Sequence, residues 1–228
     1  MRNNHVIVLA ECALAVALAV VLNLLVIRLP INIAGGSISL TMLPIAIVAI
    51  RRGSAAGAAA GLLFGTLDLF IGPYMVHWVQ VILDYPLPYM LFGLGVGLFS
   101  RWHAKIADGI TSWSQSAKTG AVPGSQAGVT PESQPAETLG SFVGKFVGKG
   151  SALLVAAVIA GGILRYFTHV VSGVIFFAEA AEGGNVWLYS LGYNITYLAP
   201  SLAATIVLAL IIVPVLIRAV PINKNDTP

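Results

Sequence analysis

The sequence predicts an all-α membrane protein that crosses the bilayer six times, and three observations carry this prediction. Hydrophobic residues make up 57% of the 228 residues, charged residues only 9%, and the mean hydropathy is +0.89, outside the range of soluble domains. Apolar runs approaching the roughly 20 residues of a membrane-spanning helix recur along the chain. The length leaves room for about six such spans and no large soluble domain. We therefore expect a single membrane domain over residues 1–228.

The first two spans are expected at residues 6–27 and 39–50. The first is interrupted by only three polar residues and ends at RLPINIAGGSIS, where proline and a glycine pair break a helix. The second stops at a pair of arginines. Near-spanning length requires the second span to tolerate Pro44 as a kink.

The third and fourth spans are expected at residues 53–72 and 79–99. The third begins GSAAGAAAG, and such small residues let neighbouring helices approach closely. The fourth cannot begin at Pro86, because about 14 residues rise only about 21 Å, less than the roughly 30 Å of the hydrocarbon core. It therefore begins near Val79 and bends at YPLP.

The last two spans are expected at residues 151–178 and 187–217. Residues 101–150 lie before them and are rich in Ser, Gly, Pro, Thr, Gln and Lys. Such a composition cannot bury enough apolar surface to fold alone. We expect most of this segment to be a flexible cytoplasmic loop.

Six spans place both termini on one side of the membrane, and the cationic residues indicate which side. With a cytoplasmic N-terminus, ten of the twelve Lys and Arg residues are cytoplasmic, as the positive-inside rule requires. These ten are Arg2, Arg51, Arg52, Arg101, Lys105, Lys118, Lys145, Lys149, Arg218 and Lys224. Because the charge is spread along the chain, it indicates topology, and we expect no nucleic-acid partner.

The fourth span carries unusual polar residues at its outer end. His77, Gln80 and Asp84 are spaced three and then four residues apart, which places them on one helical face. A carboxylate inside a bilayer needs a cation or a hydrogen-bond donor. Asp84 therefore either pairs with a protein group, such as Arg165 or a tyrosine, or binds a ligand.

The fifth and sixth spans add an imidazole, an amide and aromatic rings near the same outer end. The candidates are Arg165, His169, Gly173 and Phe177 in the fifth span and Tyr189, Tyr193, Asn194 and Tyr197 in the sixth. If these groups converge with the carboxylate, they form a site for a flat, polar heterocycle that can carry positive charge. The alternative is that the tyrosines form only the interfacial aromatic belt.

Other chemistries find less support in the sequence. The four histidines lack paired metal-ligand spacing and there is one cysteine, so we expect neither a metal nor a cofactor. No Walker sequence is present, and we expect no ATP hydrolysis by this chain. Ser172, three residues after His169, leaves an intramembrane hydrolase as an alternative. An independent secondary transporter is a further alternative, although interrupted helices in two matching halves are missing.

Three regions together resemble the thiamine-specific S components of energy-coupling factor (ECF) transporters. They read GGSISLTMLPI, VQVILDYPLPYMLFGLGVGLF, and RYFTHVVSGVIFF followed by LYSLGYNITYLAPS. The resemblance implies a six-helix, substrate-binding subunit of the prokaryotic plasma membrane with cytoplasmic termini. It implies capture of thiamine from outside, and partnership with a transmembrane T component and two cytoplasmic ATPases. An S component for another vitamin, or for a thiazole or pyrimidine precursor, is the nearest alternative.

The resemblance also implies roles for residues. In that family a carboxylate recognises the aminopyrimidine, a histidine and aromatic rings sandwich the ligand, and tyrosine and asparagine of the last helix complete the pocket. The expected substrate-binding residues are Asp84, Tyr85, His169, Phe177, Tyr189 and Asn194, together with Gln80 and Tyr193 from their positions in the spans. Two departures would weaken stacking: the family typically has tryptophan where this chain has Phe177, and the first outer loop, a lid in the family, has no tryptophan.

The first span is rich in alanine. Ala13 and Ala17, like Ala15 and Ala19 on a neighbouring stripe, are spaced for close helix contact. In the resembling family an alanine motif docks the T component, which implies this role for Ala13 and Ala17. Packing within the same bundle is the alternative.

Overall fold

The chain folds into a bundle of helices, seen in a computed structural model that describes residues 4–25, 38–72, 74–100 and 149–220. Within these residues there are helices and turns but no strand. The helices are α1 (Asn4–Leu25), α2 (Met42–Arg52), α3 (Ser54–Asp68), α4 (Trp78–Asp84), α5 (Pro86–Gly97), α8 (Lys149–Phe176), the short 3-10 helix η2 (Ala178–Ala181) and α9 (Val186–Ala219). The loop expected at 101–150 lies almost entirely outside the described residues.

Each of the six expected spans contains helix, but not all of these helices are long. Among the residues that the structure describes, four stretches are long and apolar enough to cross a membrane: His5–Leu24, Trp78–Gly97, Gly150–Phe176 and Val186–Ile217. By contrast, α2 has 11 residues, a length of about 16 Å, and nearly all of it is buried between other helices. Pro44 lies in its first turn, where a missing N–H costs no helical hydrogen bond, so the expected kink is not needed.

The fourth span bends where the prolines predict it. Tyr85 separates α4 from α5, with backbone angles of φ −116° and ψ −81°. The residue before a proline is disfavoured in helical geometry, whereas Pro86 suits the first position of a new helix. The bend directs α4 against α8.

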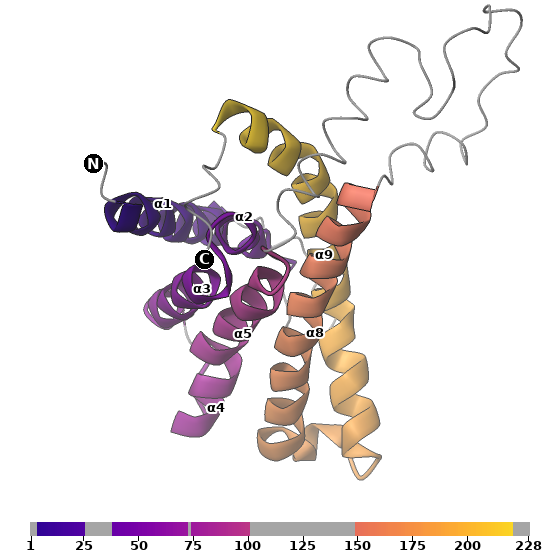
Figure 1. The fold of residues 1–228 in the computed structure, drawn as a ribbon. Coiled ribbons are helices and arrows are strands. Elements are labelled where there is room, and N and C mark those ends of the chain that lie inside the picture. The colour runs from indigo at the N-terminus through magenta and orange to yellow at the C-terminus, as the bar shows by residue number, and fades with distance from the viewer. Residues whose placement is uncertain (1–3, 26–37, 73, 101–148, 221–228) are drawn as a thin grey trace, which may run out of the picture.

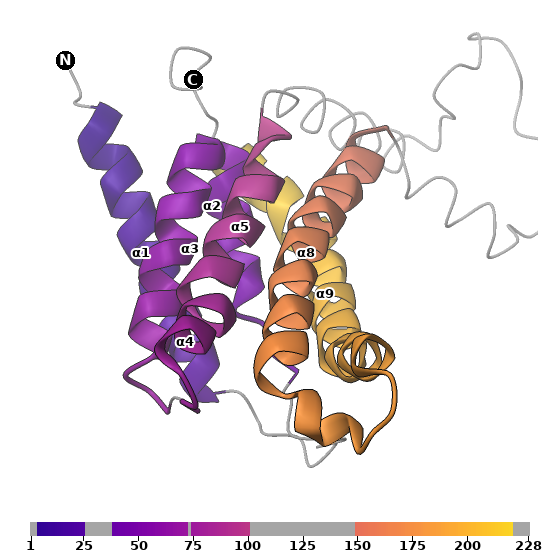
Figure 2. The same cartoon turned by 90° about the horizontal axis from the view of Figure 1, so that it is seen from below.

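Figure 2 shows α1, α3, α5, α8 and α9 in this order across the bundle, and each contacts the next. The small residues of α3 make the α3–α5 contact close. A Cβ atom at Gly57, Gly61 or Gly65 would overlap backbone of α5 or of Tyr85 just before it. These glycines recur every four residues and therefore present one helical face, which confirms that small residues serve helix approach in this span.

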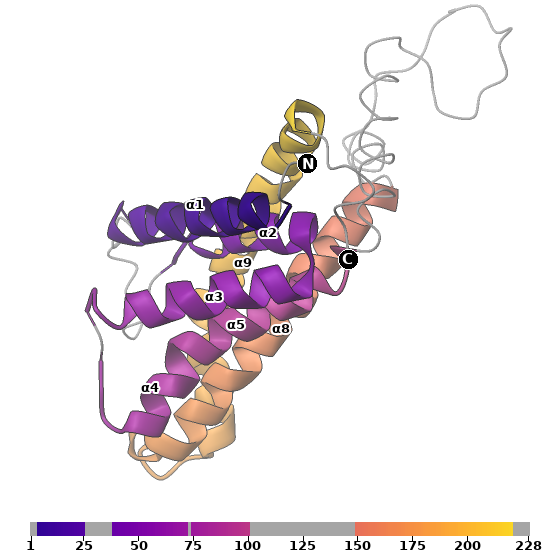
Figure 3. The ribbon, with the colours of Figure 1, turned by 60° about the vertical axis from the view of Figure 1, so that its left-hand side comes forward.

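Two polar regions lie at opposite ends of the bundle. At one end, the carboxylate of Glu11 in α1 contacts Arg51 and Arg52 of α2, and Arg51 also donates to the backbone carbonyl of Val220 after α9. The other end of the bundle holds α4 and the connection between α8 and α9 that contains η2 (Figures 1 and 3). This second end holds the candidate site.

Candidate functional site

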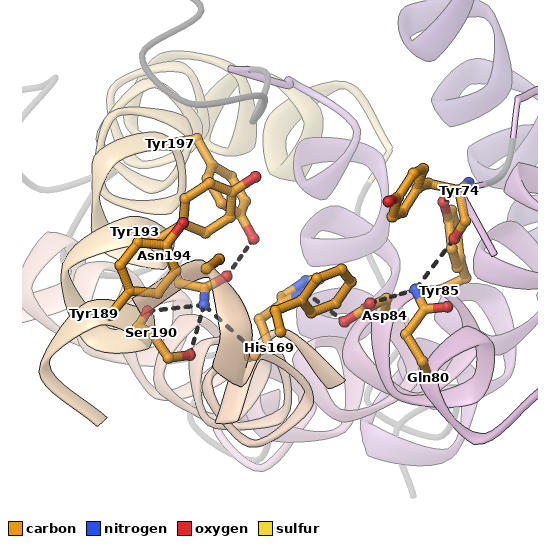
Figure 4. Close-up of a pocket in the computed structure, with 13 residues that line it drawn as sticks. Tyr74, Gln80, Asp84, Tyr85, His169, Tyr189, Ser190, Tyr193, Asn194 and Tyr197 are labelled. Atoms are coloured by element: carbon orange, nitrogen blue, oxygen red, sulfur yellow. Dashed lines mark hydrogen bonds and ion pairs between the residues drawn. The ribbon is translucent and has the colours of Figure 1, made fainter. Parts of the chain in front are cut away.

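A cavity of about 590 Å³ opens between α4, α8 and α9. It is within the volume range typical of small-molecule sites. Its lining residues are Tyr74, Gln80, Asp84, Tyr85, His169, Gly173, Phe177, Ala180, Tyr189, Ser190, Tyr193, Asn194 and Tyr197. The structure thus brings all eight residues predicted for substrate binding to the lining of one cavity, and Figure 4 shows His169 between the α4 side and the tyrosines of α9.

Asp84 provides the carboxylate of this cavity. Its Oδ2 accepts a hydrogen bond of 2.6 Å from Gln80 Nε2, and its Oδ1 lies 3.4 Å from His169 Nδ1. No Lys or Arg is among the described residues that line the cavity. The carboxylate is therefore held by an amide and an imidazole, and lone pairs on both oxygens remain available to a ligand.

His169 presents its second ring nitrogen without a protein partner. Nε2 is buried and makes no hydrogen bond to any described residue, while the ring meets Tyr197 edge-on at a centroid distance of 6.1 Å. When Nδ1 carries the proton facing Asp84, Nε2 of the neutral ring is an acceptor. A buried acceptor without a partner is costly, so a ligand donor at this position would be favourable.

The α9 wall is built around the amide of Asn194. Its Nδ2 donates to the Ser190 carbonyl at 2.9 Å and lies 3.4 Å from the His169 carbonyl, while its Oδ1 accepts from the Tyr197 hydroxyl at 2.5 Å. Asn194 therefore braces α9 against α8 and orients Tyr197. The ring of Tyr193 lies between Tyr189 and Tyr197, with centroid distances of 6.2 and 5.8 Å.

The opposite wall includes residues before α4. The Tyr74 ring stacks against Phe177 at 6.2 Å, and its backbone N–H donates to the Tyr85 hydroxyl at 2.7 Å. His77 caps the N-terminus of α4 by accepting from the Val79 N–H. It is exposed and is not among the residues that line the cavity.

Some lining residues had no role in the sequence predictions. Ser190 lies four residues before Asn194, so helical periodicity could have placed it on the same face. Tyr74 and Ala180 lie outside α-helices, where periodicity gives no indication.

Arg165 does not pair with Asp84. Its guanidinium Cζ lies 3.9 Å from the centroid of the Tyr89 ring, and among the described residues the Asp84 carboxylate contacts Gln80 and His169. The hydrolase alternative also lacks its central contact, because the Ser172 hydroxyl has no hydrogen-bond partner within the described part of the chain.

The two alanine stripes of α1 face different surroundings. Ala15 and Ala19 belong to the buried core, whereas Ala13 and Ala17 are exposed on the bundle surface. Ala15 and Ala19 therefore pack within the bundle, whereas Ala13 and Ala17 do not.

Comparison with known proteins agrees with this architecture. Residues 9–221 match a protein family described as Thiamine transporter protein. The chain belongs to the thiamine transporter family. Thiamine transporter ThiT of Bacillus subtilis is 31% identical, covering 99% of this chain and 98% of the relative. ThiT of Lacticaseibacillus paracasei is 30% identical, covering 96% and 91%.

A solved structure supports the assignment to the thiamine transporter family at the level of the fold. The structure of ThiT from Listeria monocytogenes is 28% identical and matches with a TM-score of 0.64, covering 99% of this chain and all of the other. The chain thus has the membrane S-component fold. Family membership and the long apolar helices place it in the cell membrane as a multi-pass protein.

Proposed function

We propose that this chain is the thiamine-binding S component of an ECF-type importer and that the cavity between α4, α8 and α9 binds thiamine. One observation carries the proposal: the Asp84 carboxylate lies among aromatic rings, and no Lys or Arg is among the described lining residues. Thiamine carries an amino-bearing pyrimidine and a thiazolium ring with a fixed positive charge. An ionised carboxylate that accepts from the amino group forms a strong, charge-assisted hydrogen bond, and its negative charge also attracts the thiazolium cation.

Residues on two sides of the cavity bind the two rings of the ligand. The Asp84 carboxylate accepts from the pyrimidine amino group beside Tyr85, and His169 Nε2 supplies a second acceptor close by. The aromatic faces of Phe177, Tyr189 and Tyr193 surround the thiazolium, because a ring face attracts a cation. Asn194 acts by holding Tyr197 in place, as its amide already has protein partners.

The outer position of the cavity follows from charge. The opposite end of the bundle carries Arg51 and Arg52, and cationic residues favour the cytoplasmic side. The cavity then opens outward, where thiamine is captured. Transport energy comes from two separate cytoplasmic ATPases, which act through a transmembrane T component.

The exposed alanine stripe of α1 is the proposed docking surface for the T component, since small residues let another helix approach closely. The double substitution Ala13→Trp with Ala17→Trp should abolish thiamine uptake by cells and leave thiamine binding to the purified subunit unchanged. Leu14→Trp with Leu18→Trp is the matched control, because both leucines are exposed on the same helix. Equal loss of uptake in both pairs would contradict a docking role for the alanines.

Thiamine binding is tested by calorimetric titration of the purified protein in detergent. The ligands are thiamine, its separate pyrimidine and thiazole halves, and riboflavin as the control. Tight binding of thiamine with weak binding of each half supports a site for both rings. Tight binding of one half without a thiamine response would replace the substrate by a precursor while keeping the S-component assignment.

A further inference from the structure

Gln80 is a buried amide whose hydrogen-bonding groups link three parts of the cavity wall. Its side chain is 1% exposed. Nε2 donates to Asp84 Oδ2 at 2.6 Å and to the Tyr74 carbonyl at 3.2 Å, while Oε1 accepts from the Val76 N–H at 3.2 Å. A carboxylate and a carbonyl only accept and a backbone N–H only donates, so this orientation satisfies every partner.

We propose that Gln80 is a positioning residue that holds Asp84 and residues 74–76 together as one preorganised wall; this inference rests on the proposed thiamine site. The reason lies in the local structure. Helix α4 has only seven residues and ends at the Tyr85 bend, and residues 74–76 lie outside any helix. Holding a binding group in place before the ligand arrives reduces the entropy lost on binding.

A second contact joins the same parts. The Tyr74 N–H donates to the Tyr85 hydroxyl, so residues on both sides of the Asp84 position in sequence hold the Tyr74 backbone. The Tyr74 ring in turn stacks against Phe177. Through Gln80, the position of the Asp84 carboxylate is therefore linked to the position of the Tyr74 ring that packs against Phe177.

The geometry separates the role of Gln80 from direct ligand contact. Both of its amide groups are engaged with the protein, and the Asp84 oxygen that it contacts keeps a further lone pair. Gln80 consequently affects ligand binding through Asp84. This distinguishes it from a residue that contributes its own hydrogen bond to the ligand.

A double-mutant cycle measured by thiamine titration tests this role. Gln80→Met keeps the length of the side chain and removes its hydrogen bonds, and we expect thiamine binding to weaken on the order of tenfold, about the value of one hydrogen bond. In an Asp84→Asn background the same substitution should cause little further loss, because residues that act through one contact are not additive. The proposal would be overturned if Gln80→Met bound thiamine with wild-type affinity. It would also be overturned if Gln80→Met weakened binding as much in the Asp84→Asn background as in the wild type.

The matched control is Thr168→Val, which removes a buried hydrogen bond to the Arg165 carbonyl outside the cavity lining. This control should bind thiamine like the wild type. If the wild type itself fails to bind thiamine, the proposed function fails. If the wild type binds and the cycle is additive, only the role of Gln80 fails.

Amide hydrogen exchange provides a test that needs neither ligand nor a Gln80 variant. Asp84→Ala removes one anchor of Gln80, so exchange at the Val76 N–H should accelerate on the order of tenfold through local opening. The Phe70 and Ile71 amides are internal controls, since they donate to the Leu67 and Asp68 carbonyls. Unchanged exchange at Val76 would show that Gln80 and Asp84 do not act together.

Discussion

Glu11 and Asp84 are both acidic residues on membrane-embedded helices, but their partners differ. Glu11 Oε1 lies 2.7 Å from Arg52 Nη2 and 3.2 Å from Arg51 Nη2. Asp84 contacts an amide and an imidazole and borders a cavity. An anion compensated by protein cations has a structural role, whereas an anion left beside an open cavity can be compensated by a cationic ligand.

The burial of the partners strengthens the contrast. The side chains of Arg51 and Arg52 are 8% and 6% exposed, and they connect α1 to α2. Arg51 also reaches the carbonyl of Val220 at the end of α9. The Glu11 cluster therefore joins three helices at one end of the bundle, while the Asp84 site leaves room between helices at the other.

Removal of the Glu11 carboxylate should have the largest effect on stability. Glu11→Ala leaves two buried guanidinium groups without their shared anion, and we expect a loss of about 3–5 kcal/mol in the free energy of unfolding. Thermal unfolding of the purified protein in detergent would measure it. Glu179→Ala is the control, because Glu179 is exposed on η2. Wild-type stability of the Glu11→Ala protein would contradict the structural role assigned to the Glu11 carboxylate.

Neutralisation of Asp84 should affect binding more than stability. Asp84→Asn keeps the shape of the side chain but loses the charge-assisted bond to the ligand, and we expect thiamine binding to weaken by about 1–3 kcal/mol. Titration measures the affinity and thermal unfolding checks that the fold is retained. An Asp84→Asn protein that binds thiamine as tightly as the wild type would contradict the role of the carboxylate. Glu182→Gln, an exposed acid after η2, is the control.

The α9 wall should give the smallest effect of the three. Tyr197→Phe removes the hydroxyl that donates to Asn194 Oδ1, and we expect a loss of about 1 kcal/mol in stability, with a weaker effect on thiamine affinity than Asp84→Asn. Tyr166→Phe is the control, since its hydroxyl donates to the Leu191 carbonyl away from the cavity lining. If Tyr197→Phe weakens binding more than Asp84→Asn, the tyrosine wall rather than the carboxylate dominates recognition.

Helical periodicity accounts for much of what the sequence predicted about the site. Asp84 and Gln80 lie one turn apart on α4, as do Tyr189 and Tyr193 on α9, and each pair lines the same cavity. This succeeds because residues four apart share a helical face in any helix. Arg165 shares a turn with His169 yet turns to the Tyr89 ring, since the neighbouring helix determines where a long side chain finds space.

By itself, the amino-acid sequence determined the membrane class, the helices, the bend before Pro86 and the polar faces, because apolar length, proline geometry and helical periodicity are local properties. Only the tertiary structure decided which faces meet. It placed Glu11 against arginines 40 and 41 residues away and linked Gln80 to the Tyr74 backbone. Such contacts depend on how helices rotate and pack against one another, and no local pattern encodes that arrangement.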